Sequence, residues 1–286
     1  MRLKPDSHAI EALVRMALLE DAPWGDITSE ALLPADLSIS AQLVAREEGV
    51  LCGEDVFSAA MSMCGPVTVS FVKLDSDTFS AGDVLAVVNG PARPMLRAER
   101  VALNFVQRLS GIATQTAKYV SETRGTKARI VDTRKTTPGL RLLERYAVRC
   151  GGGHNHRFSL SDALLAKDNH LAALRNSRDK DLTTGLRAAF AHLPHTTHKE
   201  VEVDRLDQIE PVLAAGVDTI MLDNFSLDDL RAGVAQIAGR ALVEASGGIS
   251  LERVREIANT GVDLISVGAL THSVRSIDLG LDFTKS

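Results

Sequence analysis

The chain has 286 residues, of which 45% are hydrophobic and 4% aromatic, and its formal net charge is −5 at pH 7. This length and apolar content exclude a disordered chain and allow one large domain or about two average ones. The balance of 37 acidic against 32 basic residues excludes a broadly basic surface for nucleic acid. Any bound anion must therefore meet a local cluster of cations, and we expect small-molecule partners and no nucleic acid.

The three cysteines, Cys52, Cys64 and Cys150, are too few and too scattered for a disulfide framework or a C-x-x-C zinc site. The charged N-terminal stretch 1–21 lacks a signal-peptide core, and no apolar run approaches the roughly 18 residues of a membrane span. These features favour a cytoplasmic enzyme that has no membrane partner.

The first 90 residues predict a small α/β domain. Apolar residues recur at helical spacing over 8–20, and Asp6 or Ser7 is a suitable N-cap for that helix. Short β-like runs bounded by turn residues follow at 40–46, 67–72 and 83–90.

A long helical stretch at 94–123 joins this domain to the rest of the chain. Pro94 suits its first turn, and Ser110-Gly111 is expected to break or kink it. We expect an N-terminal domain that includes part of this bridging helix, a catalytic domain, and a C-terminal segment that returns to the N-terminal domain. The expected ranges are 1–113, 114–272 and 273–286.

From residue 128 onward, apolar strands alternate with helical stretches. Amphipathic segments such as 206–216 and 251–261 each end at a glycine, as helix C-termini often do. Repeating βα units with nearly continuous apolar strands predict a parallel sheet covered by helices, either closed as a barrel or open and doubly wound. We favour the barrel, although six clear strands are fewer than the usual eight. The expected strands are "ARIVDT" (128–133), "ALLAKD" (163–168), "KEVEVD" (199–204), "TIMLDN" (219–224), "ALVEAS" (241–246) and "LISVGA" (264–269).

Charged or small residues follow nearly every one of these strands, and this pattern is the reason for favouring a barrel. In a βα barrel the carboxyl ends of the strands converge on one mouth, where active sites are built. Ionisable groups gathered there must pair with each other or with a charged ligand. The residues are Arg134 and Lys135, Lys167 and Asp168, Glu202 and Asp204, Asp223 and Asn224, Glu244 and Ser246, and Gly268.

The signs of these charges indicate the kind of ligand. Arg134, Lys135 and Lys167, joined by Arg157 from the loop after Gly151-Gly152-Gly153, suit carboxylates and a phosphate leaving group. Glu202 and Asp223 can hold sugar hydroxyls, coordinate Mg²⁺ or stabilise a cationic transition state. A polyanionic, phosphorylated substrate that carries a sugar satisfies all of these groups.

Two glycine-containing loops follow the last two strands, "ASGGI" (245–249) and "SVGALTH" (266–272). Small residues let backbone N–H groups approach a phosphate closely, and a phosphate site in this position recurs in βα barrels. Tight turns without a ligand explain the glycine content equally well, so this feature supports the phosphate site only together with the charges.

Long contiguous motifs occur over almost the whole chain. They are "LLEDAPWGDITSEALLP" (18–34), "AREEGVLCG" (45–53), "AERVALNFVQRLSGIAT" (98–114), "DTRKTTPGLRLLERYAVRCGGGHNHRFSLSDALLAKDNH" (132–170), "EVEVD" (200–204), "IMLDNF" (220–225), "EASGGI" (244–249) and "DLISVGALTHS" (263–273). In these motifs the chain resembles the quinolinate phosphoribosyltransferases, the carboxylating nicotinate-nucleotide pyrophosphorylases of NAD biosynthesis. The resemblance implies an N-terminal α/β sandwich-like domain followed by an incomplete, TIM-like βα barrel.

The resemblance also implies the reaction and its residues. Quinolinate and 5-phosphoribosyl-1-pyrophosphate would react with Mg²⁺ to give nicotinate mononucleotide, pyrophosphate and carbon dioxide. The implied ligands of quinolinate are Arg134, His156, Arg157 and Lys167, with Thr133 beside them and Lys135 facing the pyrophosphate or quinolinate. Glu202 and Asp223 would bind ribose hydroxyls or the metal, and with Lys135 they form the implied catalytic set. The implied 5′-phosphate cradle is formed by the amides of Ser246, Gly247, Gly248, Val267, Gly268 and Ala269.

Arg100, on the bridging helix, would by the same resemblance enter the pocket of a neighbouring subunit, which implies a homodimer or a higher homo-oligomer. Three alternatives stay open. One is a paralogue of the same fold associated with molybdenum transport, and the second is a Schiff-base barrel lyase that uses Lys167, which would require that lysine to be desolvated. The third is a non-catalytic binding module, which predicts tight ligand binding without turnover. The protonation state of His156 and the direct metal ligands are not determined by the sequence.

Overall fold

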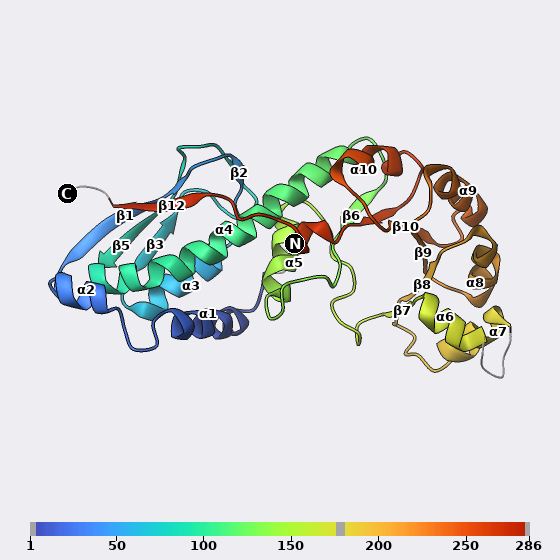
Figure 1. The fold of residues 1–286 in the computed structure, drawn as a ribbon, viewed down its shortest axis with the longest axis horizontal. Coiled ribbons are helices and arrows are strands. Elements are labelled where there is room, and N and C mark those ends of the chain that lie inside the picture. The colour runs from blue at the N-terminus through green and yellow to red at the C-terminus, as the bar shows by residue number, and fades with distance from the viewer. Residues whose placement is uncertain (1–3, 176–180, 284–286) are drawn as a thin grey trace. The chain divides into compact units, whose positions relative to one another are not determined.

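The computed structural model describes residues 4–175 and 181–283, and the chain divides into two compact units (Figure 1). The first unit takes in the described residues up to 117, together with 136–152 and those from 270 on. The second takes in 118–135 and 153–269. Within the described parts of the chain, no helix is both long and apolar enough to cross a bilayer.

An antiparallel sheet in the order β12-β1-β5-β3 forms the centre of the first unit (Figure 1). The strands expected near 40–46, 67–72 and 83–90 are confirmed as β1, β3 and β5. The fourth strand comes from the far end of the chain and pairs antiparallel with β1, placing Leu281 opposite Leu43. The bounds are β1 (Ser38–Ala45), β3 (Thr68–Phe71), β5 (Val84–Pro91) and β12 (Leu279–Phe283), and β2 (Gly49–Val50) pairs separately with β4 (Thr78–Phe79).

Helix α1 (Ser7–Asp21) confirms the predicted N-terminal helix and shows which residue caps it. The Asp6 carboxylate accepts hydrogen bonds from the amides of His8 and Ala9 at 3.0 and 3.4 Å, so Asp6 is the N-cap. Its buried side chains, Ile10, Val14 and Leu18, lie on one face, and the helix packs against α3 (Glu54–Cys64). A short helix, α2 (Ile27–Leu32), follows α1.

Helix α4 (Ala92–Glu122) runs without a break, so the expected interruption at Ser110-Gly111 is wrong. The Ser110 hydroxyl donates to the carbonyl of Cys52 at 3.2 Å and accepts from the Cys52 amide at 3.0 Å, which satisfies it outside the helix. A Cβ at position 111 would lie 2.3 Å from the carbonyl oxygen of Arg275. Gly111 therefore lets the C-terminal segment pass close to a regular helix.

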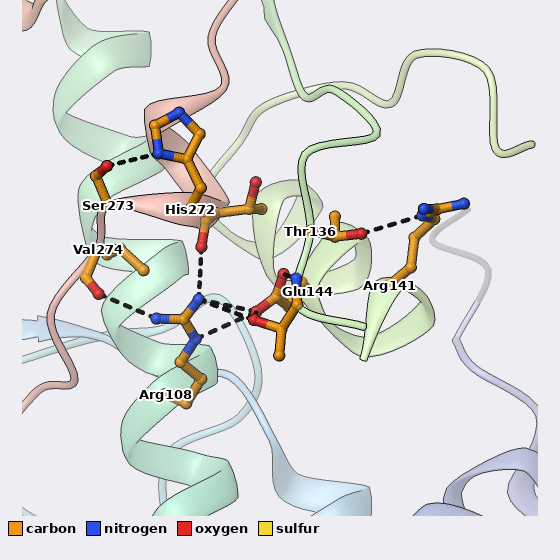
Figure 2. Close-up of polar contacts among 9 residues, drawn as sticks. Arg108, Thr136, Arg141, Glu144, His272, Ser273 and Val274 are labelled. Atoms are coloured by element: carbon orange, nitrogen blue, oxygen red, sulfur yellow. Dashed lines mark hydrogen bonds and ion pairs between the residues drawn. The ribbon is translucent and has the colours of Figure 1, made fainter. Parts of the chain in front are cut away.

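A buried carboxylate joins α4 to α5 (Arg141–Cys150). Glu144, whose side chain is fully buried, accepts from Arg108 Nε and Nη2 at 3.2 and 2.9 Å (Figure 2). It also accepts from the amide and hydroxyl of Thr137, at 3.0 and 2.8 Å. The same guanidinium donates to the carbonyls of Thr271 and Val274, the latter at 3.0 Å. Arg108 thus fastens α4, α5 and the C-terminal segment to one another.

Six parallel strands form the second unit in the order β6-β11-β10-β9-β8-β7 (Figure 1). All six strands expected from the sequence are confirmed, and the sheet order ends at β6 and β7, so the TIM-like barrel is incomplete. The bounds are β6 (Arg129–Val131), β7 (Leu164–Ala166), β8 (Lys199–Val203), β9 (Thr219–Asp223), β10 (Leu242–Ser246) and β11 (Leu264–Ser266).

Helices follow the strands and cover the outer side of the sheet (Figure 1). α8 ends at Gly216, whose φ of +86° and ψ of 53° are the left-handed values expected of a glycine cap. α10 stops earlier than expected, with Asn259 rather than Gly261 as its cap. The elements are α6 (Asp168–Arg175), α7 (Leu182–Phe190), the 3₁₀ turn η1 (Leu206–Gln208), α8 (Ile209–Ala215), α9 (Leu227–Ile237), α10 (Leu251–Ala258) and α11 (Ala269–His272).

Candidate active site

The strand register places the acidic residues on one face of the parallel sheet. Glu202 on β8 lies opposite Met221 on β9, and Asp223 at the end of β9 lies opposite Ser246 at the end of β10. Since side chains alternate between faces along a strand, Glu202, Asp223 and Ser246 share a face. The sheet therefore brings together the carboxylates that the sequence pattern had placed at successive strand ends.

Arg134 and Arg157 both belong to the second unit, and their positive charges influence each other. Arg134 follows β6, and Arg157 lies in the loop before β7, where its Nη1 donates to the carbonyl of Ala163 at 2.9 Å. Burial and the positive charge of Arg134 lower the pKa of Arg157. Because the two positive charges repel each other, an anion bound beside them would be favoured.

Asp132, the first residue of "DTRK", was missed by sequence reasoning. It is fully buried at the end of β6 and accepts from the backbone amide of His156 at 2.8 Å and from Nδ2 of Asn155 at 2.5 Å. The backbone around His154 also pairs with β6, since the His154 amide donates to Ile130 O at 2.8 Å. Asp132 thus fixes the loop that carries His156 and Arg157. An acid directly after an apolar strand was the available signal.

Lys167, after β7, forms an ion pair with Glu202 on β8. The side chain of Lys167 is 45% exposed, whereas that of Glu202 is 12% exposed. A Schiff-base lysine requires a desolvated amine without a carboxylate partner that stabilises its charge. The observed exposure and ion pair argue against the lyase alternative.

His156 lies beside two buried carboxylates that are deeper on the inner face. Its Nε2 is 3.0 Å from Glu200 Oε2 and 3.6 Å from Glu244 Oε2. The side chains of Glu200 and Glu244 are 5% and 0% exposed. All three border a cavity of about 510 Å³. Sequence reasoning missed Glu200, although it has the same strand parity as Glu202.

The loop after β10 has the backbone shape that its glycines predict. Gly247 and Gly248 have φ values of +94° and +55°. A Cβ at position 247 would lie 2.2 Å from Oδ1 and 2.8 Å from the amide nitrogen of Asn224. The Asn224 amide donates to the carbonyl of Ser246 at 2.9 Å, which holds the ends of β9 and β10 together. The loop is therefore closely packed on its β9 side.

The remaining expected residues are placed as follows. The Val267 amide donates to the carbonyl of Val131 at 3.0 Å, so it joins β11 to β6. The Lys135 amide donates to the hydroxyl of Thr133 at 3.0 Å, which bends the chain directly after β6. Gly268 and Ala269 follow β11. Arg100 is exposed on α4 in the first unit, whereas every other expected site residue lies in the second unit.

These features define an enzyme of the βα-barrel class, with cations, carboxylates and glycine turns at the carboxyl ends of its strands for a phosphorylated, acidic substrate. Residues 26–110 match the family model described as the N-terminal domain of quinolinate phosphoribosyl transferase, and residues 112–282 match the model of its C-terminal domain. The chain belongs to the quinolinate phosphoribosyltransferase family, and it is a phosphoribosyltransferase of NAD biosynthesis.

Individual relatives agree with this assignment. The chain is 46% identical to the nicotinate-nucleotide pyrophosphorylase (carboxylating) of Mycobacterium leprae, over 94% of this chain and 95% of that protein. It is similar to the structure of NadC from Streptococcus pyogenes, with a TM-score of 0.92, 40% identity, and coverage of 99% and 100%. The nicotinate-nucleotide pyrophosphorylase from Francisella tularensis gives a TM-score of 0.92 and 38% identity, with 99% of each chain covered. These names favour the biosynthetic enzyme over the molybdenum-associated paralogue.

Proposed function

We propose that the strand ends of the second unit bind quinolinate and 5-phosphoribosyl-1-pyrophosphate together, and that they direct the transfer and decarboxylation that yield nicotinate mononucleotide. The observation that carries this proposal is the meeting of opposite charges at one mouth. The Arg134 and Arg157 charges influence each other within this unit, and the Lys167–Glu202 pair lies near Asp223 on neighbouring strands. A dicarboxylate joined to a pentose matches this pattern of cations beside carboxylates.

We assign the cations to two groups. Arg134, Arg157 and Lys167, with His156, bind the two carboxylates of quinolinate, for which planar guanidinium forks are well suited. Lys135 is exposed just beyond the Thr133 turn and faces the pyrophosphate or the quinolinate. Lys167 exchanges its bond with Glu202 for one with the substrate, which frees the Glu202 carboxylate to face the ribose.

Glu202 and Asp223 also fit Mg²⁺, which takes oxygen ligands and is commonly held by one or two carboxylates together with substrate phosphates. They lie on one face of adjacent strands. Neither belongs to a group of three described His, Cys, Asp or Glu side chains close enough to enclose an ion. We assign Glu202 and Asp223 as the residues that would hold a magnesium ion. When bound, the ion neutralises charge on the leaving group.

Both steps of the reaction require stabilisation of developing charge. The bond between the ribose C1 and the pyrophosphate oxygen breaks, and the electron pair leaves with pyrophosphate. Glu202 or Asp223 stabilises the positive ribosyl centre until the pyridine nitrogen attacks it. The bond between ring C2 and its carboxylate then breaks, and carbon dioxide leaves. The electron pair stays on C2, where the adjacent positive nitrogen stabilises it, and C2 takes a proton from water to give nicotinate mononucleotide. The cations hold the ring in place during both steps.

We assign the 5′-phosphate to the loops after β10 and β11, with Ser246, Gly247 and Gly248 on one side and Val267, Gly268 and Ala269 on the other. Since the Val267 amide donates its hydrogen bond to the Val131 carbonyl on β6, its contribution is to hold the second loop in position. Close packing of Gly247 on Asn224 keeps the first loop in place.

Gly247→Ala is expected to raise KM for phosphoribosyl pyrophosphate by about 10²-fold, since a displacement of about 1 Å at a positioned group has effects of that size. The added Cβ would displace Asn224 and the loop. Steady-state kinetics measure the effect. Gly216→Ala is the matched control, because its φ is +86° with nothing within 4 Å of the added Cβ. It should lose a little stability and no affinity, and equal effects of both variants would contradict the loop assignment.

We further propose a homodimer in which Arg100 completes the pocket of the neighbouring subunit. Arg100 is exposed on α4, and the first unit also exposes large apolar side chains on α1 and α2, among them Met16, Leu19 and Ile27. Large apolar side chains exposed on a surface would be covered in such a dimer.

Subunit complementation tests this arrangement. Arg100→Ala and Glu202→Gln should each be nearly inactive alone. After mixing with exchange of subunits, about a quarter of wild-type activity should appear, because half of the dimers are mixed and each contains one intact site. Light scattering gives the mass of the species. Mixtures that stay inactive although mixed dimers form would show that Arg100 acts within its own subunit or not at all.

A cytoplasmic location agrees with three free cysteines among the described residues, which suit a reducing compartment.

The reaction itself is tested by incubating the purified protein with quinolinate, phosphoribosyl pyrophosphate and Mg²⁺ and following nicotinate mononucleotide. We expect turnover that requires the metal. A folded, dimeric protein that binds quinolinate without forming product would favour the paralogue or a binding protein.

A further inference from the structure

The buried group of His156, Glu200 and Glu244 has no role in the reaction described above except through His156. The three side chains come from the loop before β7, from β8 and from β10. One ring nitrogen of His156 and one carboxylate oxygen from each glutamate all lie within 4.8 Å of one another. The Glu200 and Glu244 side chains are almost wholly buried, and among the described residues neither oxygen of Glu244 has a hydrogen-bond partner within 3.5 Å. Two carboxylates in such a place require a compensating positive charge or a proton.

The imidazole is the nearest group that can supply this charge. Nε2 must carry a proton to donate to Glu200 Oε2 at 3.0 Å, and a second proton on Nδ1 makes the ring cationic. Burial alone would lower the pKa of His156, but the hydrogen bond to Glu200 and the charges of Glu244, Glu200 and Asp132 outweigh it and raise this pKa. Burial and the charge of Glu200 raise the pKa of Glu244 to about 8.

Arg157 also borders the cavity, and its positive charge interacts with Glu200. Of the elements that border the cavity, β9 contributes Thr219 and β11 contributes Leu264, both uncharged. Its other titratable or charged residues are His154, Arg157, Asp162, His198 and Arg129. A cationic His156 lies within 3.6 Å of both buried carboxyl groups and compensates their negative charge.

We propose that Glu200 and Glu244 are positioning residues that hold His156 as an imidazolium at the base of the mouth, so that it offers a positive charge to a carboxylate of the substrate. This use of the charge rests on the proposed function, because it requires an acidic substrate. The charge itself does not, because it follows from groups within the chain. A neutral ring in the same place would donate at most one hydrogen bond and would leave buried negative charge uncompensated.

The test measures the ring directly, in the protein without substrate. NMR of ¹³C- and ¹⁵N-labelled histidine, with the His156 signals assigned from His156→Gln, gives the titration midpoint and the tautomer. We expect a midpoint above 6.5 for the wild type, with Nε2 protonated throughout. Glu200→Gln should lower the midpoint by about one pH unit or more, as expected for loss of an opposite charge within about 4 to 6 Å. Glu200→Asp keeps the charge and should preserve most of the elevation.

Glu244→Gln provides a second variant if Glu200→Gln does not fold, and it should lower the midpoint by a smaller amount. A wild-type midpoint at or below 6.5, or midpoints unchanged in folded variants, would show that the carboxylates do not hold the charge. The samples are also analysed for Zn²⁺ and Mn²⁺ before and after treatment with EDTA. A divalent ion removed from this group, with a changed His156 titration, would make it a metal site and overturn the proposal.

Quinolinate binding separates this inference from the proposed function. By calorimetry, wild-type affinity should fall about tenfold as pH rises through the His156 midpoint, the effect of losing a hydrogen bond to a charged group. In Glu200→Gln the same fall should begin at lower pH. If His156 titrates as expected but quinolinate neither binds nor reacts, the proposed function fails and the charge assignment stands. If the enzyme turns over while His156 is neutral, the proposed function stands and the charge assignment fails.

Discussion

Replacing Arg108 with alanine is expected to destabilise the protein by about 3 to 5 kcal/mol, because it leaves a buried carboxylate without its charged partner. Glu144 is fully buried, and the guanidinium of Arg108 is its ion-pair partner, at 2.9 Å (Figure 2). The substitution also removes the donors to the carbonyls of Thr271 and Val274. Urea unfolding at neutral pH, followed by circular dichroism, measures the loss.

Two comparisons decide whether the burial of the Arg108–Glu144 pair causes the loss of stability. Arg275 forms an ion pair with Glu47 in the same unit, but its side chain is 75% exposed, so Arg275→Ala should cost at most about 1 kcal/mol. Adding Glu144→Gln to Arg108→Ala should recover part of the loss, since it removes the buried charge. Similar costs for the two arginine variants, or no recovery in the double variant, would mean that Arg108 does not anchor α4 to α5.

The barrel strands were predictable because each is a short apolar run that ends at a polar or small residue, and that pattern is local. The regular course of α4 was not predictable from Ser110-Gly111. What keeps the helix regular there comes from elsewhere in the chain, since Ser110 bonds Cys52 and Gly111 lies against the Arg275 carbonyl. Pairing of β12 with β1 joins residues more than 230 positions apart, and the exact register cannot be deduced from either strand alone.

The site was predictable where residues follow strand ends, and less so where they lie within strands. Glu202 and Asp223 stood out as charges at the end of apolar runs, whereas Glu200 is the second residue of β8. Its parity with Glu202 places it on the same inner face, which was a usable signal. The partner of His156 could not be predicted, because Glu200 and Glu244 meet it only through the order of strands in the folded sheet.

Glu202→Gln is expected to lower kcat/KM by about 10²- to 10³-fold, the size of effect found when one preorganised charge-stabilising group is removed from an active site. The substitution keeps the shape of the side chain and removes the negative charge that would stabilise the ribosyl centre and bind the magnesium ion. It also leaves Lys167 without its present partner. Since quinolinate contacts other groups, its affinity should change much less than kcat. Initial rates over a range of both substrates and Mg²⁺ measure the separate effects.

Glu210→Gln is the matched control, because Glu210 also forms an ion pair in the second unit, with Arg240, but on the exposed side of α8. Its removal should leave kcat/KM unchanged. Asp223→Asn should resemble Glu202→Gln if the two carboxylates share the ion and the ribose, and the double variant should then lose less than the product of the single effects. A Glu202→Gln enzyme as active as Glu210→Gln would remove Glu202 from the reaction and leave Asp223 as the carboxylate that faces the ribose.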